Sequence, residues 1–218
     1  MPSEPRVEEQ PTAVLDRRER KKNQTRRRLQ LTTLQMATEH GLAGVTTEQI
    51  ADAADVSPRT FFNYFPSKEA ALMSADPGRD ERLRALLVAR PADESPVASL
   101  RAIMVDLAGE LVQRREEWQM RAALVREHPE LLAASFASWG RLERALALGV
   151  ADRAGLDVVR DVYPALLVGV MVSAMRTVTL RWGAGDGDAA LPDMVAEAID
   201  VIGAGLPIPA PTDRTQHG

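Results

Sequence analysis

Apolar side chains recur every three or four positions along most of this chain, the spacing that places them on one face of an α-helix. From Leu29 the pattern continues through Leu34 and Ala37, and Gly41 follows as a C-terminal stop signal. No segment shows the strict alternation of a half-buried strand. We therefore predict an all-α fold with helices at about 18–40, 47–54, 58–65, 68–75, 97–115, 118–126, 129–153, 157–182 and 192–204.

Prolines and glycines divide the helical pattern into two domains. Pro77 and Gly78 interrupt it, and Pro91, Ser95 and Pro96 mark a further loop. We expect a small helical domain at 17–76 and a larger one at 77–206, between disordered tails at 1–16 and 207–218.

The basic residues are concentrated near the N-terminus, although the formal net charge of the whole chain is −4. Eight arginines and lysines and one acidic residue lie between Arg17 and Arg28, which gives this segment a charge of +7. A basic segment on an acidic body is typical of a protein that presents one end to a polyanion. The same pattern fits a solvated charge run or a disordered basic arm.

Several kinds of protein are disfavoured by what the sequence lacks. It has no cysteine, which excludes disulfides and thiolate metal sites and fits a reducing cytosol. Residues 1–16 contain no apolar run that could act as a secretory signal. The most apolar stretch, Val162–Met175, is about 14 residues long, whereas a membrane span needs about 20. We expect a soluble, cytoplasmic protein that does not enter a membrane.

The segment 46–65 has the features of a helix-turn-helix. Thr46 and Gln49 form a capping box that begins one helix, and Asp55 and Val56 form the turn. Ser57 is the N-cap of the second helix, with Pro58 at its first position. A short rigid helix with a polar face fits the major groove of DNA.

The second helix has two distinct sides. Pro58, Phe61 and Phe65 fall together and are predicted to pack on Ile50 and Ala54. The opposite stripe consists of Arg59, Thr60 and Asn63, with Phe62 and Tyr64 at its margins.

At these residues the chain resembles the DNA-binding domain of TetR-family regulators. The resemblance covers Gln24 to Leu72, about a quarter of the chain, and rests on residues at the family's spacing: Gly41, Thr47, Ile50, Ala51, Ala54, Val56, Ser57, Thr60, Tyr64, Phe65 and Lys68. It implies that Thr47 and Lys68 contact phosphates, that Arg59, Thr60 and Asn63 face base edges, and that Tyr64 meets the adjoining backbone. The full set of expected DNA contacts is Arg26, Arg27, Thr47, Ser57, Arg59, Thr60, Phe62, Asn63, Tyr64 and Lys68.

Two positions depart from the family pattern. Phe62 stands where tyrosine is common, which removes a phosphate hydrogen bond and favours contact with a thymine methyl group. Ala37 replaces a common phenylalanine, leaving volume for Met36 or Phe61 to fill.

The larger domain carries weaker motifs. Glu117, Trp118, Arg121, Leu124, His128–Leu131 and Glu143 resemble a TetR subgroup that includes the mycofactocin-system regulator. This implies an acyl-CoA or another large amphipathic effector. The candidate ligand-binding residues are Trp118, Arg121, Leu124, Phe136, Trp139, Met171 and Met175, although each also fits an ordinary core or surface position.

The helices at about 157–182 and 192–204 are the expected homodimer interface, where TetR-like proteins pair. Gly169, Ser173 and Ala174 allow another helix to approach closely. A two-fold dimer would place two DNA-reading helices, one from each copy, about 34 Å (one DNA turn) or somewhat more apart on a pseudo-palindromic operator. The resemblance implies a repressor that its effector releases from DNA.

Two other functions fit the sequence less well. An enzyme is disfavoured because no nucleophile elbow or P-loop occurs, and the three histidines, His40, His128 and His217, lack metal-ligand spacing. We therefore expect neither catalytic residues nor a metal or cofactor. A helical protein whose basic arm binds acidic partners or a membrane explains the charge distribution but not the Ser57–Pro58 helix start.

Overall fold

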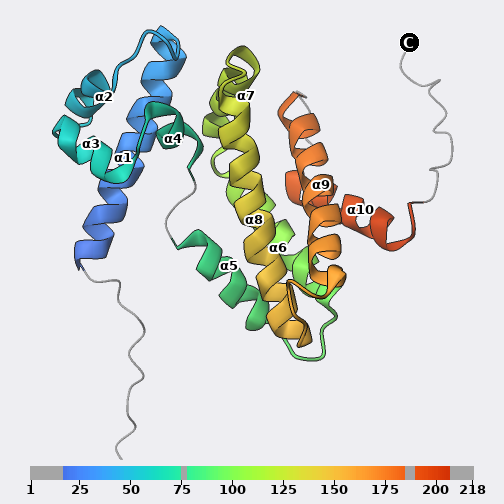
Figure 1. Cartoon of the computed structure of the whole chain (residues 1–218). Coiled ribbons are helices and arrows are strands. Elements are labelled where there is room, and N and C mark those ends of the chain that lie inside the picture. The colour runs from blue at the N-terminus through green and yellow to red at the C-terminus, as the bar shows by residue number, and fades with distance from the viewer. Residues whose placement is uncertain (1–16, 75–77, 185–189, 207–218) are drawn as a thin grey trace, which may run out of the picture. The chain divides into compact units, whose positions relative to one another are not determined.

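A computed structural model of the chain describes residues 17–74, 78–184 and 190–206. In these ranges every regular element is a helix, as the sequence predicts. The ten helices are α1 (Arg17–His40), α2 (Thr47–Ala53), α3 (Pro58–Tyr64), α4 (Lys68–Met73), α5 (Arg79–Val88), α6 (Pro96–Val112), α7 (Arg115–Glu127), α8 (Leu131–Ala154), α9 (Val162–Ala184) and α10 (Leu191–Gly203) (Figure 1). The tails expected to be disordered, 1–16 and 207–218, lie outside the described residues.

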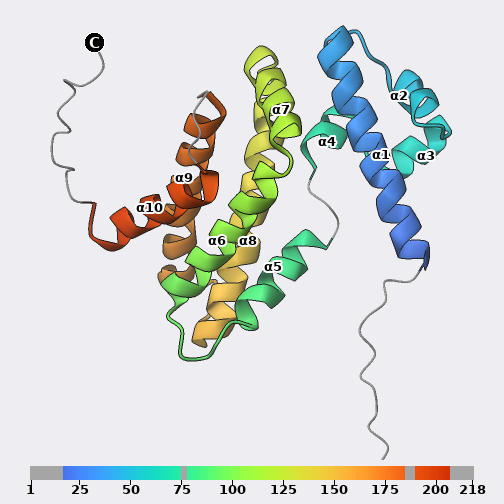
Figure 2. The same ribbon diagram turned by 180° about the vertical axis from the view of Figure 1, so that it is seen from behind.

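The chain forms two compact units, Met1–Leu72 and Met73–Gly218. In the first, α1 packs on α2, and α2 packs on α3. The N-terminal end of α1 extends beyond the other helices of this unit (Figure 2). Its core consists of Leu29, Val45, Ile50, Ala51, Ala54, Phe61, Phe65 and Ala71. Ala37 is buried, and Met36 is partly buried and packs against this core.

The predicted start and stop signals of the first unit are confirmed. Gly41 has a φ of +75°, a left-handed conformation that ends α1 at little cost only for glycine. The Thr46 hydroxyl accepts from the Gln49 amide, and the Gln49 side chain accepts from the Thr46 amide. Val56 packs against the core as expected, but Pro58 is exposed and does not share the buried side of Phe61.

The second unit is a bundle in which α8 packs on α5 and α9, and α10 packs on α6 and α9. The predicted stripe on α6 is confirmed, since Leu100, Met104 and Leu107 are buried and Leu111 packs against them. Its core joins residues of α5, α6, α8, α9 and α10.

Helix α5 was not predicted from the sequence. Only Leu83 and Leu87 carry its apolar stripe, because it is ten residues long and lies between two proline-containing segments. It approaches α8 at Gly149, where a Cβ atom would meet the Leu87 side chain at 2.8 Å. This close contact explains how so short an apolar stripe forms a stable helix.

The predicted start of the helix at 157–182 was wrong, because α9 begins at Val162. The Asp157 carboxylate accepts from the amides of Val159 and Arg160, and the Asp161 carboxylate accepts from the Asp157 amide. Such bonds from side chain to backbone compete with a helix. Similarly, α8 begins at Leu131 rather than at Pro129.

One helix within the described residues, Val162–Gly183, is long and apolar enough to cross a membrane by length and composition. The expectation that this segment is too short was therefore wrong, because the helix continues past Arg176. Only 33% of its most apolar window is buried within the chain. Its exposed side carries Tyr163, Leu166, Val170, Ser173, Thr177 and Leu180, spaced alternately by three and four residues.

Candidate nucleic-acid interface

The local sequence fixes both ends of α3. The Ser57 hydroxyl accepts from the Thr60 amide at 3.1 Å, and Pro58 occupies the first turn, where a missing N–H costs nothing. At the other end Phe65 adopts an extended backbone and donates its amide to the Phe61 carbonyl at 3.0 Å. The helix is thus a short rod of seven residues.

The two sides of this rod differ sharply in exposure. Phe61 and Phe65 are buried, while Arg59 and Asn63 are exposed and the Phe62 ring is 51% exposed. The exposed side therefore offers a guanidinium, an amide and an aromatic ring, which can donate to, accept from or contact base edges.

Three other predicted contacts on α3 are engaged within the unit. The Thr60 hydroxyl lies 2.8 Å from the Ser57 hydroxyl, so each has a partner within the chain. Tyr64 is half-buried and packs against the core. Arg59, Phe62 and Asn63 are consequently exposed side chains of this helix that are available to a ligand.

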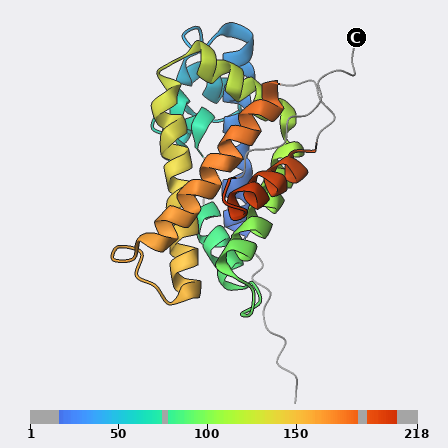
Figure 3. The same cartoon turned by 90° about the vertical axis from the view of Figure 1, so that its right-hand side faces the viewer.

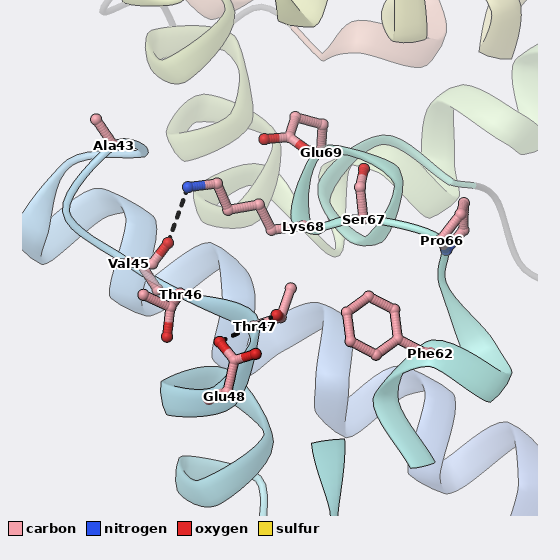
Figure 4. A pocket seen from close by; sticks show the side chains of 10 residues that line it. All are labelled: Ala43, Val45, Thr46, Thr47, Glu48, Phe62, Pro66, Ser67, Lys68 and Glu69. Atoms are coloured by element: carbon pink, nitrogen blue, oxygen red, sulfur yellow. Dashed lines mark hydrogen bonds between the residues drawn. The ribbon is translucent and has the colours of Figure 1, made fainter. Parts of the chain in front are cut away.

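An open pocket of about 390 Å³ lies beside the exposed Phe62 ring. Figure 4 shows Phe62 and Thr47 at this pocket, together with the start of α4. The lining residues are Ala43, Val45, Thr46, Thr47, Glu48, Phe62, Pro66, Ser67, Lys68 and Glu69. The predicted contacts Thr47, Phe62 and Lys68 are thus brought together at one surface.

Lys68 is held differently from what its expected role implies. Its amine donates to the backbone carbonyls of Leu42 at 2.6 Å and Val45 at 2.8 Å. These bonds join the start of α4 to the loop that precedes α2. Since a lysine amine has three N–H donors, one is left over for a phosphate.

Thr47 lies beside a negative charge. Its hydroxyl is 3.3 Å from the Glu48 carboxylate. The pKa of the Glu48 carboxyl lies below its usual value, because hydrogen bonds stabilise the ionised form. The largest effect comes from the backbone amide of Glu48 and the next from the Thr46 hydroxyl. This charge suits the first turn of α2, and it weakens any phosphate contact that the Thr47 hydroxyl makes.

The three consecutive arginines of α1 have different surroundings. Arg28 is exposed and Arg27 is half-buried. The Arg26 guanidinium donates to the Tyr64 carbonyl at 3.0 Å and stacks on the Phe65 ring, 4.2 Å from its centroid. Exposed basic residues precede them on the same helix: Arg18, Arg20, Lys21 and Lys22.

Most of the predicted ligand-binding residues lie inside the second unit. Leu124, Met171 and Met175 are buried, and Trp118 and Trp139 pack against its core. Phe136 is different, because its side chain is 60% exposed on α8. A wall role inside the bundle does not fit this position.

Arg121 has a partner that sequence reasoning missed. It forms a 3.2 Å ion pair with Glu117, and both side chains are largely buried. The spacing of four residues along α7 was the signal that could have revealed the pair. Among the described residues, no three histidine or acidic side chains gather into a metal-binding group.

Comparison with known proteins assigns both parts of the chain. Residues 32–73 match the family model of bacterial regulatory proteins of the tetR family, and residues 94–207 match that of the MftR C-terminal domain. The HTH-type transcriptional regulator TcmR of Streptomyces glaucescens is 33% identical over 171 residues, covering 76% of each chain. The Mycobacterium tuberculosis protein named as a mycofactocin biosynthesis regulator, MftR, is 25% identical over 86% of this chain and 93% of its own.

Solved structures show the same fold. FadR from Bacillus halodurans is 18% identical with a TM-score of 0.57, covering 84% of this chain and 96% of its own. Thermus thermophilus FadR, a TetR-family repressor solved in complex with lauroyl-CoA, is 24% identical with a TM-score of 0.54. The match covers 86% of this chain and 99% of that protein.

The two family models and the relative at 33% identity agree with the geometry of the helix-turn-helix. This family is non-enzymatic, and its members typically bind DNA as dimers that respond to small molecules. The chain belongs to the TetR family and is a DNA-binding transcriptional regulator.

Proposed function

We propose that the chain is a ligand-responsive repressor that binds a pseudo-palindromic operator as a homodimer and is released by an amphipathic effector. Residues 17–76 bind DNA, and residues 77–206 bind the effector and the second copy. The observation that carries the proposal is the division of α3 into a buried side with Phe61 and Phe65 and an exposed side with Arg59, Phe62 and Asn63.

On operator DNA, Arg59 and Asn63 read base edges, with Thr60 beside them, and Phe62 contacts a thymine methyl group. Backbone contacts come from Arg27 and Thr47, from Ser57 and Tyr64 at the two ends of α3, and from the remaining N–H of Lys68. Such contacts set the position on the duplex without reading its sequence.

The dimer forms through α9 and α10. Figure 3 shows these helices at one face of the second unit. The exposed stripe of α9 is mostly apolar, with Tyr163, Leu166, Val170 and Leu180 exposed, and a Cβ atom at Gly169 would meet nothing within 4 Å in its own chain. Helix α9 is apolar enough to cross a membrane, yet little of it is buried within its own chain. A second copy that covers this stripe would account for both observations. We accordingly place the protein in the cytoplasm, with its DNA.

The effector is an acyl-CoA or a similar amphipathic molecule, held among Trp118, Leu124, Trp139, Met171 and Met175. Two facts support this: the match to the MftR C-terminal domain and the fold shared with a repressor that binds lauroyl-CoA. Arg121, with its Glu117 partner, is the polar group of this region that could meet a thioester or carboxylate.

The DNA-binding proposal is tested with a duplex enriched by the full-length protein from a random library. Arg59→Ala should weaken binding to this duplex by about 1–3 kcal/mol and relax its sequence preference, with little change on a random duplex. The control is Arg18→Ala, an exposed arginine of α1, which should weaken binding to both duplexes equally. Equal losses on both duplexes for Arg59→Ala would remove its role as a base reader.

The effector proposal is tested on the same protein–duplex complex. Lauroyl-CoA should lower the affinity by between about five- and 150-fold, whereas CoA alone should not. Mass spectrometry of ligands retained by the purified protein then identifies the natural class. An affinity unchanged by lauroyl-CoA, together with a retained ligand of another class, would reject acyl-CoA as the effector.

A further inference from the structure

Arg26 is distinguished from the other basic residues of α1 by where its side chain lies. Leu29, Gln30 and Thr33 follow it at three, four and seven positions, and all three are buried. Arg26 therefore lies at the N-terminal end of the stripe by which α1 packs on the unit. Arg28 lies outside that stripe and is exposed.

The contacts of Arg26 are with the end of the reading helix. Its Nη1 atom donates to the carbonyl oxygen of Tyr64, the last residue of α3, at 3.0 Å. The last carbonyls of a helix have no partner within it, and a cationic donor there also suits the helix dipole. Arg26 thus caps the C-terminal end of α3, although it lies 38 positions before Tyr64 in the sequence.

The guanidinium is also fixed in orientation. It stacks on the buried Phe65 ring, 4.2 Å from the centroid, and its Nε atom is shielded from solvent. A guanidinium can stack on a ring and donate in its own plane at the same time, whereas a lysine amine has no plane. These contacts therefore require arginine rather than positive charge alone.

We infer that Arg26 is a positioning residue that holds the C-terminal end of α3 against α1 and so sets how the reading side chains meet the base edges. This goes beyond the charge-based expectation that Arg26 contacts a phosphate, and it rests on the proposed reading role of α3. The basic start of α1 and the base-reading side of α3 act on the same duplex, so an error in their relative position lowers specific binding first.

The test uses Arg26→Lys in the full-length protein, which keeps the charge and removes the planar contacts. Affinity for the library-selected duplex should fall about tenfold or more, as expected when a hydrogen bond from a charged donor is lost. Affinity for a random duplex, and the dependence of log K on log salt, should stay as in the wild type. The matched control Arg28→Ala should weaken binding to both duplexes and reduce the slope of log K against log salt by about 0.9.

A second variant, Phe65→Leu, removes the ring under the guanidinium and keeps most of the apolar volume. It should show the same loss of specific binding, and the double variant should lose less than the sum of the two single losses. Measurements are made well below the melting temperature, with the folded fraction followed by circular dichroism. If Arg26→Lys is unfolded under these conditions, Phe65→Leu alone decides the inference.

The outcomes separate this inference from the proposed function. Wild-type affinity of both folded variants for the selected duplex would overturn the positioning role and leave the proposed function standing. So would additive losses in the double variant. Failure of the wild-type protein to enrich any duplex would overturn both.

Discussion

Lys68 donates a 2.6 Å hydrogen bond to the carbonyl oxygen of Leu42, and so ties the start of α4 to the loop after α1. The same amine donates to Val45, which makes this lysine part of the framework that supports α2 (Figure 4). Its contribution to DNA binding is therefore in part indirect.

Lys68→Met should lower the stability of the first unit. The variant keeps the apolar stem but leaves two carbonyls without their charged donor, which costs about 1–3 kcal/mol. For a domain of this size each kcal/mol lowers the melting temperature by about 4–8 °C. The measurement is a thermal melt, with Lys21→Met, an exposed lysine of α1, as the control that should melt like the wild type.

A different result would favour a direct phosphate contact as the main role of Lys68. If Lys68→Met melts like the wild type but binds all DNA more weakly, with a smaller salt slope, the amine acts mainly on a phosphate.

The sequence predicted those features whose causes are local. The capping box at Thr46 and Gln49 and the stop at Gly41 each depend on residues a few positions apart, so a single sequence contains the whole signal. The TetR-type motif added the spacing between these signals. For this reason α1 to α4 were predicted well, and so were the two sides of α3 except for Pro58, which is exposed.

Features that depend on contacts between residues far apart in the sequence could not be predicted from local signals. Arg26, Arg27 and Arg28 look alike in sequence, and only the fold shows that the first meets Tyr64. Helix α5 depends on its contact with Gly149, more than 60 positions away, and its own pattern is too short to predict it. The start of α9 depends on competing side-chain bonds of Asp157.

Glu94 should make folding stability depend on acidic pH. Arg90 donates to its carboxylate at 2.7 Å and Ser99 at 2.9 Å, and these bonds, with the charge of Arg153, lower the pKa of Glu94 to about 2. A folded-state pKa below the unfolded value of 4.5 gives stabilisation that is complete above that value. This stabilisation is lost as the pH falls from about 4.5 toward 2.

The measurement is urea unfolding across this pH range. Glu94→Gln should be less stable than the wild type near neutral pH, and the difference between the two should shrink as the pH falls. Ser99→Ala removes one of the hydrogen bonds to the carboxylate. It should also weaken the dependence of folding stability on pH, but by less than Glu94→Gln does. A constant difference between wild type and Glu94→Gln across the range would contradict the assignment.

Gly183→Ala should destabilise the second unit. A Cβ atom on Gly183 would overlap the six-membered ring of Trp118, which packs against Trp182 with ring centroids 5.8 Å apart and planes tilted by 54°. The Arg115 guanidinium covers the Trp182 ring at 4.8 Å, so the cluster has little room to move. Overpacking of this kind costs about 1–3 kcal/mol, more than the helix propensity that alanine contributes.

Denaturant unfolding of Gly183→Ala measures this cost. The matched control is Gly140→Ala in α8, where a Cβ atom meets nothing within 4 Å and alanine should be neutral or stabilising by up to about 1 kcal/mol. Trp118→Leu should relieve the overlap, so that adding Gly183→Ala to it costs less than in the wild type. Equal costs in the two backgrounds would show that Trp118 is not the obstacle.

Leu166→Glu should separate the proposed dimer into monomers. Leu166 is 60% exposed in the N-terminal half of the exposed stripe on α9, and a second copy that covers this stripe would bury the new carboxylates without a partner. Sedimentation equilibrium should show the monomer mass, and affinity for the selected duplex should fall because the two half-sites are no longer linked. Leu132→Glu, at an exposed leucine of α8, is the control and should remain dimeric. If Leu166→Glu stays dimeric while Leu132→Glu dissociates, the copies pair through α8 rather than α9.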